Sequence, residues 1–286
     1  MSIVIWHDGR LVGPDEPLVS AVDHGLTVGD GVFETLAVYD GAPFALTRHL
    51  ARLQRSAAGL GLAEPDLDRV RAGVDSVLAA APGAGRLRIT VTDGPGPLGS
   101  FRDAPDASRQ TVLVLAGPAG TPKPARVIRV PWVRNERSAV VGLKTTSYAE
   151  NVVALAAALE AGADEALLAY SVGELCEGTA SNVFLERGGE LVTPHLSSGC
   201  LAGITRELVL EWGREAGLPV READPGELRY DVLDEVSGGR ARLALAGSIR
   251  NLVPVVALDG VEVEPGELTS AMVEVFAARR RETPDP

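Results

Sequence analysis

Residues 141–153 read Val-Gly-Leu-Lys-Thr-Thr-Ser-Tyr-Ala-Glu-Asn-Val-Val, and the residue of interest in this stretch is Lys144. The chain has 27 basic residues, of which only Lys123 and Lys144 are lysines. Lys123 stands in an exposed linker pattern, Thr-Pro-Lys-Pro, whereas Lys144 follows an apolar run, so its stem is expected to enter the interior. A desolvated lysine can lose its proton and attack a carbonyl, which arginine cannot do. This stretch alone is equally consistent with amine chemistry and with a lysine that snorkels from a strand end.

The length and composition limit the class of protein. The 286 residues suffice for one large domain or two ordinary ones, and 45% hydrophobic residues with a mean hydropathy of +0.11 predict a sizeable core. No apolar run reaches membrane-spanning length and no basic-then-apolar leader is seen, so neither a membrane nor a secreted protein is expected. The net charge of −12 argues against a nucleic-acid binder.

Cysteine and histidine usage points to a reduced protein without a metal. Two cysteines, Cys176 and Cys200, are too few for a disulfide scaffold, so we expect a cytoplasmic protein. The histidines show no metal-ligand spacing, and no metal site is predicted; they are His7, His24, His49 and His195.

The first part of the chain shows strands and two consecutive helices, an α+β pattern. Alternation and turn residues predict strands at 3–6, 10–12, 32–39, 86–92 and 111–116. Apolar spacing predicts helices at 45–60 and 66–80, with Thr47 as N-cap of the first. Residues 117–124 are rich in glycine and proline and mark a linker.

The second part mixes the same elements. Strands are predicted at 125–133, 165–170, 182–186, 190–193, 242–246 and 253–258, and helices at 148–161, 203–216 and 268–281. We therefore expect an N-terminal α/β domain at 1–118, an interdomain linker at 119–131 and a C-terminal domain at 132–286.

Two further stretches carry polar groups suited to chemistry. Glu177 lies on a glycine turn with Ser181 and Asn182, and its carboxylate is suited to pair with a buried heteroaromatic nitrogen, although a turn acid that faces water is the commoner case. Gly203, Ile204 and Thr205 open a helix, where free N–H groups and a hydroxyl bind anions such as phosphate; ordinary capping by Thr205 is the alternative.

Two weaker features belong with these. Ser248, in a small-residue turn, is a further hydroxyl for the same anion. Arg52 falls between the core positions Leu50 and Leu53, so it points either across a cleft or into solvent. Together, an amine nucleophile, an acid for a ring nitrogen and several phosphate ligands are what pyridoxal 5′-phosphate requires.

Six motifs resemble the class IV aminotransferases, the fold-type IV group of pyridoxal-phosphate enzymes, and most closely their D-amino-acid aminotransferase and aminodeoxychorismate lyase branch. They are Gly29-Asp-Gly-Val-Phe-Glu-Thr, His49-Leu-Ala-Arg-Leu, Leu143-Lys144, Glu177-Gly-Thr-Ala-Ser-Asn182, Gly203-Ile-Thr-Arg206 and Leu252-Val-Pro-Val255. The motifs follow the family order over most of the chain. The resemblance implies a two-domain fold, with a smaller N-terminal α/β domain and a larger C-terminal domain with a barrel-like β core. It also implies a homodimer with active sites near the interface.

The resemblance assigns a role to each motif residue. Lys144 forms the Schiff base and shuttles the proton, and Glu177 pairs with the pyridine nitrogen. The remaining cofactor contacts fall to the phosphate ligands, to the residues beside Glu177 and to a tyrosine at the phenolic oxygen: Arg52, Gly203, Ile204, Thr205, Ser248, Ser181, Asn182 and Tyr148.

The substrate side departs from the D-amino-acid aminotransferase pattern. An Arg-x-His pair that clamps the substrate carboxylate in that group is replaced here by Leu98 and Ser100, in the loop 94–102. Arg88 and Arg102 are the alternative partners of the carboxylate, and for Arg88 a surface ion pair is an equal alternative. Phe33 belongs to the same side by its place in the first motif.

The predicted function is transamination between an amino donor and an α-keto acid. A looser clamp favours D-amino acids as donors and, by extension, primary (R)-amines. Aminodeoxychorismate lyase, which forms 4-aminobenzoate and pyruvate, is the alternative, and a branched-chain L-amino-acid aminotransferase is third. A cofactor-binding scaffold without activity is the non-enzymatic hypothesis.

Overall fold

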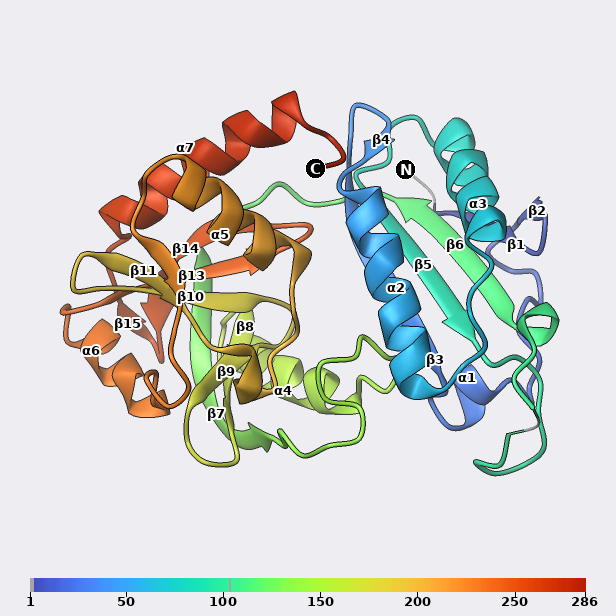
Figure 1. Cartoon of the computed structure of the whole chain (residues 1–286), viewed down its shortest axis with the longest axis horizontal. Helices are drawn as coiled ribbons and strands as arrows, with labels where there is room; N and C mark the ends of the chain where they lie inside the picture. The colour runs from blue at the N-terminus through green and yellow to red at the C-terminus, as the bar shows by residue number, and fades with distance from the viewer. Residues whose placement is uncertain (1–2, 103) are drawn as a thin grey trace. The chain divides into compact units, whose positions relative to one another are not determined.

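The computed structural model describes residues 3–102 and 104–286 (Figure 1). Its contacts divide the chain into two compact units. The first unit comprises Met1–Gly120, Leu143–Ser147 and Thr283–Pro286, and the second comprises Thr121–Gly142 and Tyr148–Glu282. These units differ from the expected ranges in three respects. Strand β7, Ala125–Arg134, fills much of the range expected as a linker. The short segment that carries Lys144 and the C-terminal segment Thr283–Pro286 both belong to the first unit.

The first unit is built on an antiparallel six-stranded sheet with the order β2-β1-β6-β5-β3-β4. Helices α2 and α3 pack against β3, β1 and β6 through one apolar core (Figure 1). The strands are β1 (Val4–His7), β2 (Arg10–Val12), β3 (Gly31–Tyr39), β4 (Ala42–Pro43), β5 (Arg86–Thr92) and β6 (Thr111–Gly117). The helices are α1 (His24–Thr27), α2 (Leu46–Leu60), α3 (Leu67–Ala80) and the 3₁₀ turn η1 (Ala107–Arg109). The predicted strands and both predicted helices are confirmed within two residues.

The start of α2 differs from the prediction. Thr47 is not the N-cap, because the helix begins at Leu46 and the cap position is held by Ala45 in a left-handed conformation, φ 56°, without a side-chain cap. The missing acceptor comes from the C-terminal end of the chain: Asp285 accepts hydrogen bonds from the backbone N–H of Thr47 at 2.9 Å and from its hydroxyl at 2.7 Å. The N–H of Ala45 also donates to the carbonyl of Pro284.

The second unit contains a nine-stranded mixed sheet with the order β12-β11-β10-β13-β14-β7-β8-β9, and β15 pairs with β14. Strand β9 stands at one end of this order, whereas β10 stands near the other end. Because the tight turn 179–181 joins these two strands directly, the sheet curls back on itself as a barrel-like core. A barrel-like core was predicted and is confirmed. Besides β7, the strands are β8 (Glu165–Tyr170), β9 (Leu175–Gly178), β10 (Asn182–Arg187), β11 (Glu190–Thr193), β12 (Val220–Glu222), β13 (Arg242–Gly247), β14 (Asn251–Leu258) and β15 (Val261–Glu262).

Helices cover this sheet. Helix α5 (Ile204–Glu215) packs on α7 (Glu267–Glu282) through Trp212 and Phe276, whose ring centroids lie 5.0 Å apart. Gly213 permits close packing of α5, because a Cβ there would lie 3.1 Å from Met272 on α7 and 2.7 Å from Val220. The other helical segments are α4 (Ala149–Glu160), α6 (Leu233–Ser237) and the 3₁₀ turns η2 (Leu196–Ser198) and η3 (Tyr230–Val232). The cysteines are both free and buried.

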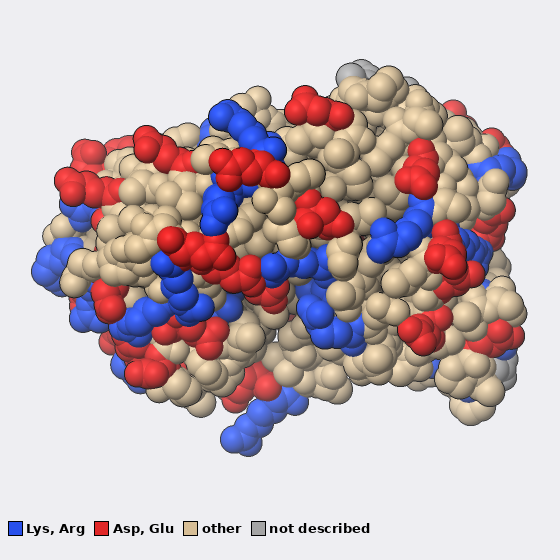
Figure 2. Space-filling model, turned by 45° about the horizontal axis from the view of Figure 1, so that its top comes forward, with Lys and Arg blue, Asp and Glu red and all other residues tan. Residues whose placement is uncertain are grey.

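Charges of both signs are mixed on the face drawn in Figure 2, where Lys and Arg are interspersed with Asp and Glu. Among the described residues, no helix is long and apolar enough to cross a membrane.

The cap supplied by Asp285 is testable by substitution. We expect Asp285→Ala to lower the free energy of unfolding by about 1 kcal/mol, the usual cost of losing an N-terminal helix cap. Urea unfolding measures this change. Asp15→Ala, an exposed turn aspartate, is the matched control and should stay within about 0.5 kcal/mol of the parent. Equal effects of the two substitutions would show that the contact does not stabilise α2.

Candidate active site

Lys144 is held by the open edge of β3. Its carbonyl accepts a hydrogen bond from Phe33 N–H at 3.0 Å, and its own N–H donates to the hydroxyl of Ser56 on α2 at 3.1 Å. Thr145 forms a β-bridge with Val32, and the N–H of Thr146 donates to the carbonyl of Gly31 at 2.8 Å. The segment is thus bridged to β3, and the backbone of the lysine is held by β3 on one side and by α2 on the other.

Phe33 brings together two cationic groups of the first unit. The Lys144 ammonium lies 4.4 Å from the centroid of the Phe33 ring, and the Arg88 guanidinium lies 3.9 Å from it. The register explains the arrangement: Arg88 on β5 pairs with Thr35, so its side chain shares a face with Phe33 two residues along β3. Three predicted site residues, Lys144, Phe33 and Arg88, are therefore neighbours in the structure.

Arg52 lies in a buried polar cluster on the opposite face of β3. Its Nε and Nη2 donate to the two carboxylate oxygens of Glu34 at 2.8 and 2.7 Å, and His49 Nδ1 donates to the same carboxylate at 2.6 Å. Glu34 is fully buried, so the alternative of a solvated Arg52 is wrong. Burial raises the pKa of Glu34, but the charge and hydrogen bonds of Arg52 and His49 outweigh it and bring the pKa to about 2. The role of Arg52 at a phosphate stays a prediction.

The other predicted substrate residues belong to the loop 94–102. Arg102 forms a two-pronged ion pair with Asp30 and donates through Nη1 to the carbonyl of Leu60 at 2.8 Å. Leu98 and Ser100 are exposed, Leu98 to 86%. Arg102 is thus already engaged by a carboxylate of the first unit, whereas Arg88 is associated with the ring beside Lys144.

Glu177, the acid predicted to pair with a ring nitrogen, lies in the second unit. Its carboxylate is 12% exposed, lies 3.4 Å from an Arg134 nitrogen and accepts a hydrogen bond from Leu201 N–H at 3.0 Å. The alternative of a turn acid facing water is therefore wrong. Arg134 was not identified from the sequence, because it lies on β7 far from the Glu177 motif.

The start of α5 is organised for an anion. Gly203, which has no side chain, occupies the N-cap position, so Thr205 is not an ordinary cap. Asn182 donates to the carbonyl of Leu201 at 2.8 Å and holds the preceding loop, and a Cβ on Gly203 would lie 2.0 Å from the Asn182 side chain. The first N–H groups of the helix, from Ile204 onward, are the groups that such an end presents to a phosphate.

A buried acid that sequence reasoning missed connects two turns of the second unit. Glu165, 1% exposed, accepts hydrogen bonds from the Ser181 hydroxyl at 2.7 Å and from Arg250 at 2.6 Å. Burial raises the pKa of Glu165, although Arg250 opposes this. Glu165 thereby joins the turn after Glu177 to the turn that carries Ser248. Tyr148 immediately precedes α4 and is half-buried.

The donor sets fit pyridoxal phosphate. The first unit supplies a lysine with a fixed backbone, and the second supplies a largely buried carboxylate on a turn and a twelve-residue helix that begins after a glycine N-cap. Thr179 belongs to the turn that follows Glu177. Its buried hydroxyl has no hydrogen-bond partner among the described residues and is therefore a polar group open to a ligand. These are the groups that the aldehyde, the ring nitrogen and the phosphate require.

The Glu34 cluster predicts a pH-dependent contribution to stability. We expect Glu34→Gln to lower the free energy of unfolding at pH 7 by about 3 kcal/mol, because it leaves Arg52 buried without its counter-charge. The folded pKa, about 2, lies below the ordinary value of 4.5, so the contribution is complete above pH 4.5 and is lost as the pH falls toward 2. The difference between parent and variant, measured by denaturant unfolding, should therefore shrink from pH 5 to pH 3. The exposed Glu64→Gln serves as control, and a difference independent of pH would contradict the assignment.

Comparison with known proteins agrees with this chemistry. Residues 31–258 match the family model for Amino-transferase class IV. A putative branched-chain-amino-acid aminotransferase of Methanocaldococcus jannaschii is 31% identical, covering 95% of this chain and 94% of the relative. A bifunctional aminodeoxychorismate lyase / D-amino acid transaminase of Mycobacterium tuberculosis is 29% identical, covering 96% of each chain. The PLP-bound form of a hypothetical aminotransferase from Mycobacterium tuberculosis superposes with a TM-score of 0.80 at 26% identity, covering 97% of this chain and 98% of that one. The chain belongs to the class IV aminotransferases and is a pyridoxal-phosphate-dependent enzyme of fold-type IV.

Proposed function

We propose that the enzyme transfers amino groups between D-amino acids and α-keto acids. The observation that supports a carboxylate-bearing substrate is the pair of cations on Phe33, Arg88 and Lys144. Since both groups lie over one ring, a carboxylate bound by Arg88 directs the amino or keto carbon of the same small molecule toward Lys144. A primary (R)-amine lacks this carboxylate and should react more slowly.

Each residue then has a defined task. Lys144 would hold the cofactor aldehyde through Nζ, and its free amine would take the proton from the substrate α-carbon and return it during transfer. The cofactor would supply an electron sink for the α-carbon when its ring nitrogen is protonated. Glu177 would keep the proton on that ring nitrogen. Thr205 and Ile204 would hold the phosphate at the start of α5, with Arg52 and Ser248 as further ligands.

Lys144 is testable by chemical labelling. Borohydride reduction of the holoenzyme should fix the cofactor on the peptide that contains Lys144, as read by mass spectrometry. Lys144→Ala should carry no label and transfer amino groups at least about 10²-fold more slowly. Lys123→Arg, which removes the only other lysine, is the control and should be labelled and active like the parent. A label on Lys123 would refute the assignment.

Two other substrate classes remain in competition, each favoured by a relative. The similarity to a bifunctional aminodeoxychorismate lyase / D-amino acid transaminase favours lyase activity as a second function. The similarity to a putative branched-chain-amino-acid aminotransferase favours L-amino acids such as L-leucine. D-Alanine with 2-oxoglutarate, L-leucine with 2-oxoglutarate, and aminodeoxychorismate should be compared as substrates. Turnover confined to L-leucine, or confined to 4-aminobenzoate formation, would exclude the proposal.

Arg88→Gln should lower kcat/KM for the preferred amino acid by about 10- to 100-fold, the value of one hydrogen bond to a charged group. The loss should appear mainly in KM, and turnover of a primary amine without a carboxylate should change little. Arg86→Gln, on the exposed part of the same strand, is the matched control. Equal losses for the amino acid and the amine would show that Arg88 does not bind the carboxylate.

The homodimer, the cytoplasmic location and the domain ranges also remain proposals. Exposed apolar side chains on α4 support an interface between copies, because such patches mark association surfaces; they are Val152, Val153 and Leu159. Light scattering that finds only a monomer would count against the dimer.

A further inference from the structure

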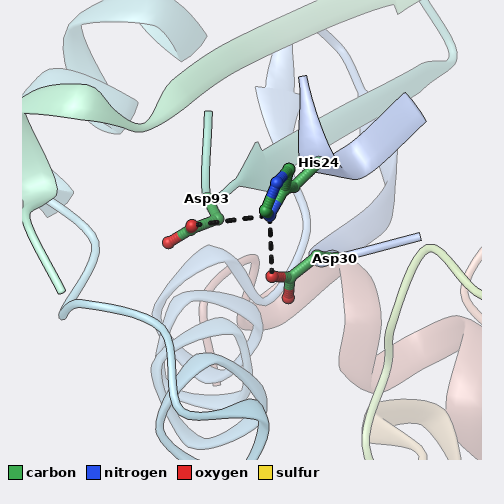
Figure 3. A group of neighbouring side chains, drawn as sticks. All are labelled: His24, Asp30 and Asp93. Atoms are coloured by element: carbon green, nitrogen blue, oxygen red, sulfur yellow. Dashed lines mark ion pairs between the residues drawn. The ribbon is translucent and has the colours of Figure 1, made fainter. Parts of the chain in front are cut away.

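A histidine and two aspartates meet in the first unit outside the groups assigned above. His24 opens α1, Asp30 precedes β3 and Asp93 follows β5 (Figure 3). His24 Nδ1 lies 3.9 Å from an oxygen of Asp30 and 4.0 Å from an oxygen of Asp93, and the three ligand atoms all lie within 4.8 Å of one another. His24 is fully buried and Asp30 is 7% exposed, so this is not a solvated acidic surface.

The hydrogen-bond pattern of His24 leaves an acceptor directed at these carboxylates. Nε2 lies 2.9 Å from the carbonyl of Pro97, which can only accept, so Nε2 carries the hydrogen. In a neutral ring Nδ1 then carries a lone pair, and among the described residues this buried atom has no hydrogen-bond partner. Figure 3 shows Nδ1 directed toward both carboxylates. Three electron-pair donors therefore converge on one point.

The two aspartates differ in their hydrogen-bond partners. Arg102 pairs with Asp30, using one lone pair on each oxygen and leaving another. No described residue donates a hydrogen bond to the Asp93 carboxylate. Burial, and next the charge of Asp30, raise the pKa of Asp93, although the charges of Arg102 and Arg109 oppose this rise.

The backbone holds the three side chains in place. The N–H of Asp30 donates to the carbonyl of His24 at 3.0 Å, and the N–H of Asp93 donates to the carbonyl of Asp30 at 3.1 Å. Gly96 lies against the imidazole, where a Cβ would come within 2.4 Å of Nε2. The arrangement is therefore set by the fold and does not depend on the side chains attracting one another.

We propose that His24, Asp30 and Asp93 form a binding site for a divalent transition-metal cation such as Mn²⁺ or Zn²⁺. Ligand atoms bonded to one ion at about 2.1 Å lie about 3–4 Å apart, close to the observed separations. One imidazole nitrogen with carboxylate oxygens suits Zn²⁺ and Mn²⁺ better than Mg²⁺ or Ca²⁺, which prefer oxygen alone. The ion would tie α1 and the start of β3 to the loop that begins at Asp93.

Mn²⁺ binding to the holoenzyme provides the test. Electron paramagnetic resonance should show one bound Mn²⁺ per chain, displaced by Zn²⁺, with the nitrogen coupling of one imidazole. This coupling is measured on the unmodified enzyme and does not depend on whether a variant folds. Absence of stoichiometric Mn²⁺, or bound Mn²⁺ without nitrogen coupling, would overturn the proposal.

Substitutions locate the ion. His24→Gln and Asp93→Asn should each weaken Mn²⁺ binding at least about tenfold, because each removes one ligand. His7→Gln is the matched control: His7 lies 3.4 Å from the single carboxylate of Asp8, without a second acid, and its loss should leave Mn²⁺ binding unchanged. Undiminished binding by folded His24→Gln and Asp93→Asn proteins would place the ion elsewhere and refute the site.

Discussion

The hydrogen bonds between the open edge of β3 and residues 144–146 determine where the chemistry of the first unit lies. They fix the backbone of Lys144 against Gly31 and Phe33, so the lysine follows the strand. Alternation along β3 then directs Phe33 toward the amine and Glu34 toward α2. A shift of one residue would exchange these two faces, placing the ring against α2 and the acid beside the lysine. The register of one strand therefore positions the nucleophile, the ring and the buried acid together.

Local sequence patterns predict the elements well and their non-local partners poorly. The alternation in 86–92 and the apolar spacing in 66–80 suffice, because each of these elements buries one face against a single layer. The N-cap of α2 could not be found this way. Thr47 has a suitable side chain, but the acceptor for its N–H is Asp285, at the far end of the sequence. The same applies to the 144–146 segment, which is far from β3 in the chain yet completes its edge.

The residues of the candidate site likewise fall into those that local sequence identifies and those that depend on non-local partners. Lys144 could be found from the rarity of lysine, and the Glu177 and Gly203 motifs from their residue types and the family resemblance. Glu34 could not, because it occupies a core position of β3 between Val32 and Leu36, where alternation predicts an apolar residue. Its burial is tolerable only because Arg52 and His49 supply three charge-assisted hydrogen bonds. Glu165 and Arg134 were missed for a related reason, since their partners are brought to them by the curled sheet.

The two polar clusters that flank the start of β3 differ in how completely their groups are satisfied, and this difference indicates different roles. In the Glu34 cluster every oxygen of the acid receives a donor, so removing one partner would leave a buried charge exposed to an apolar core. In the His24 cluster the histidine directs an acceptor at two further acceptors, and only Asp30 receives a donor. Burying these three acceptors costs desolvation free energy, and contacts between acceptors form no hydrogen bonds that offset this cost. The first cluster is therefore complete as a structural unit that orients Arg52, whereas the second keeps a buried lone pair of His24 without a donor, which is the feature that a bound cation would satisfy.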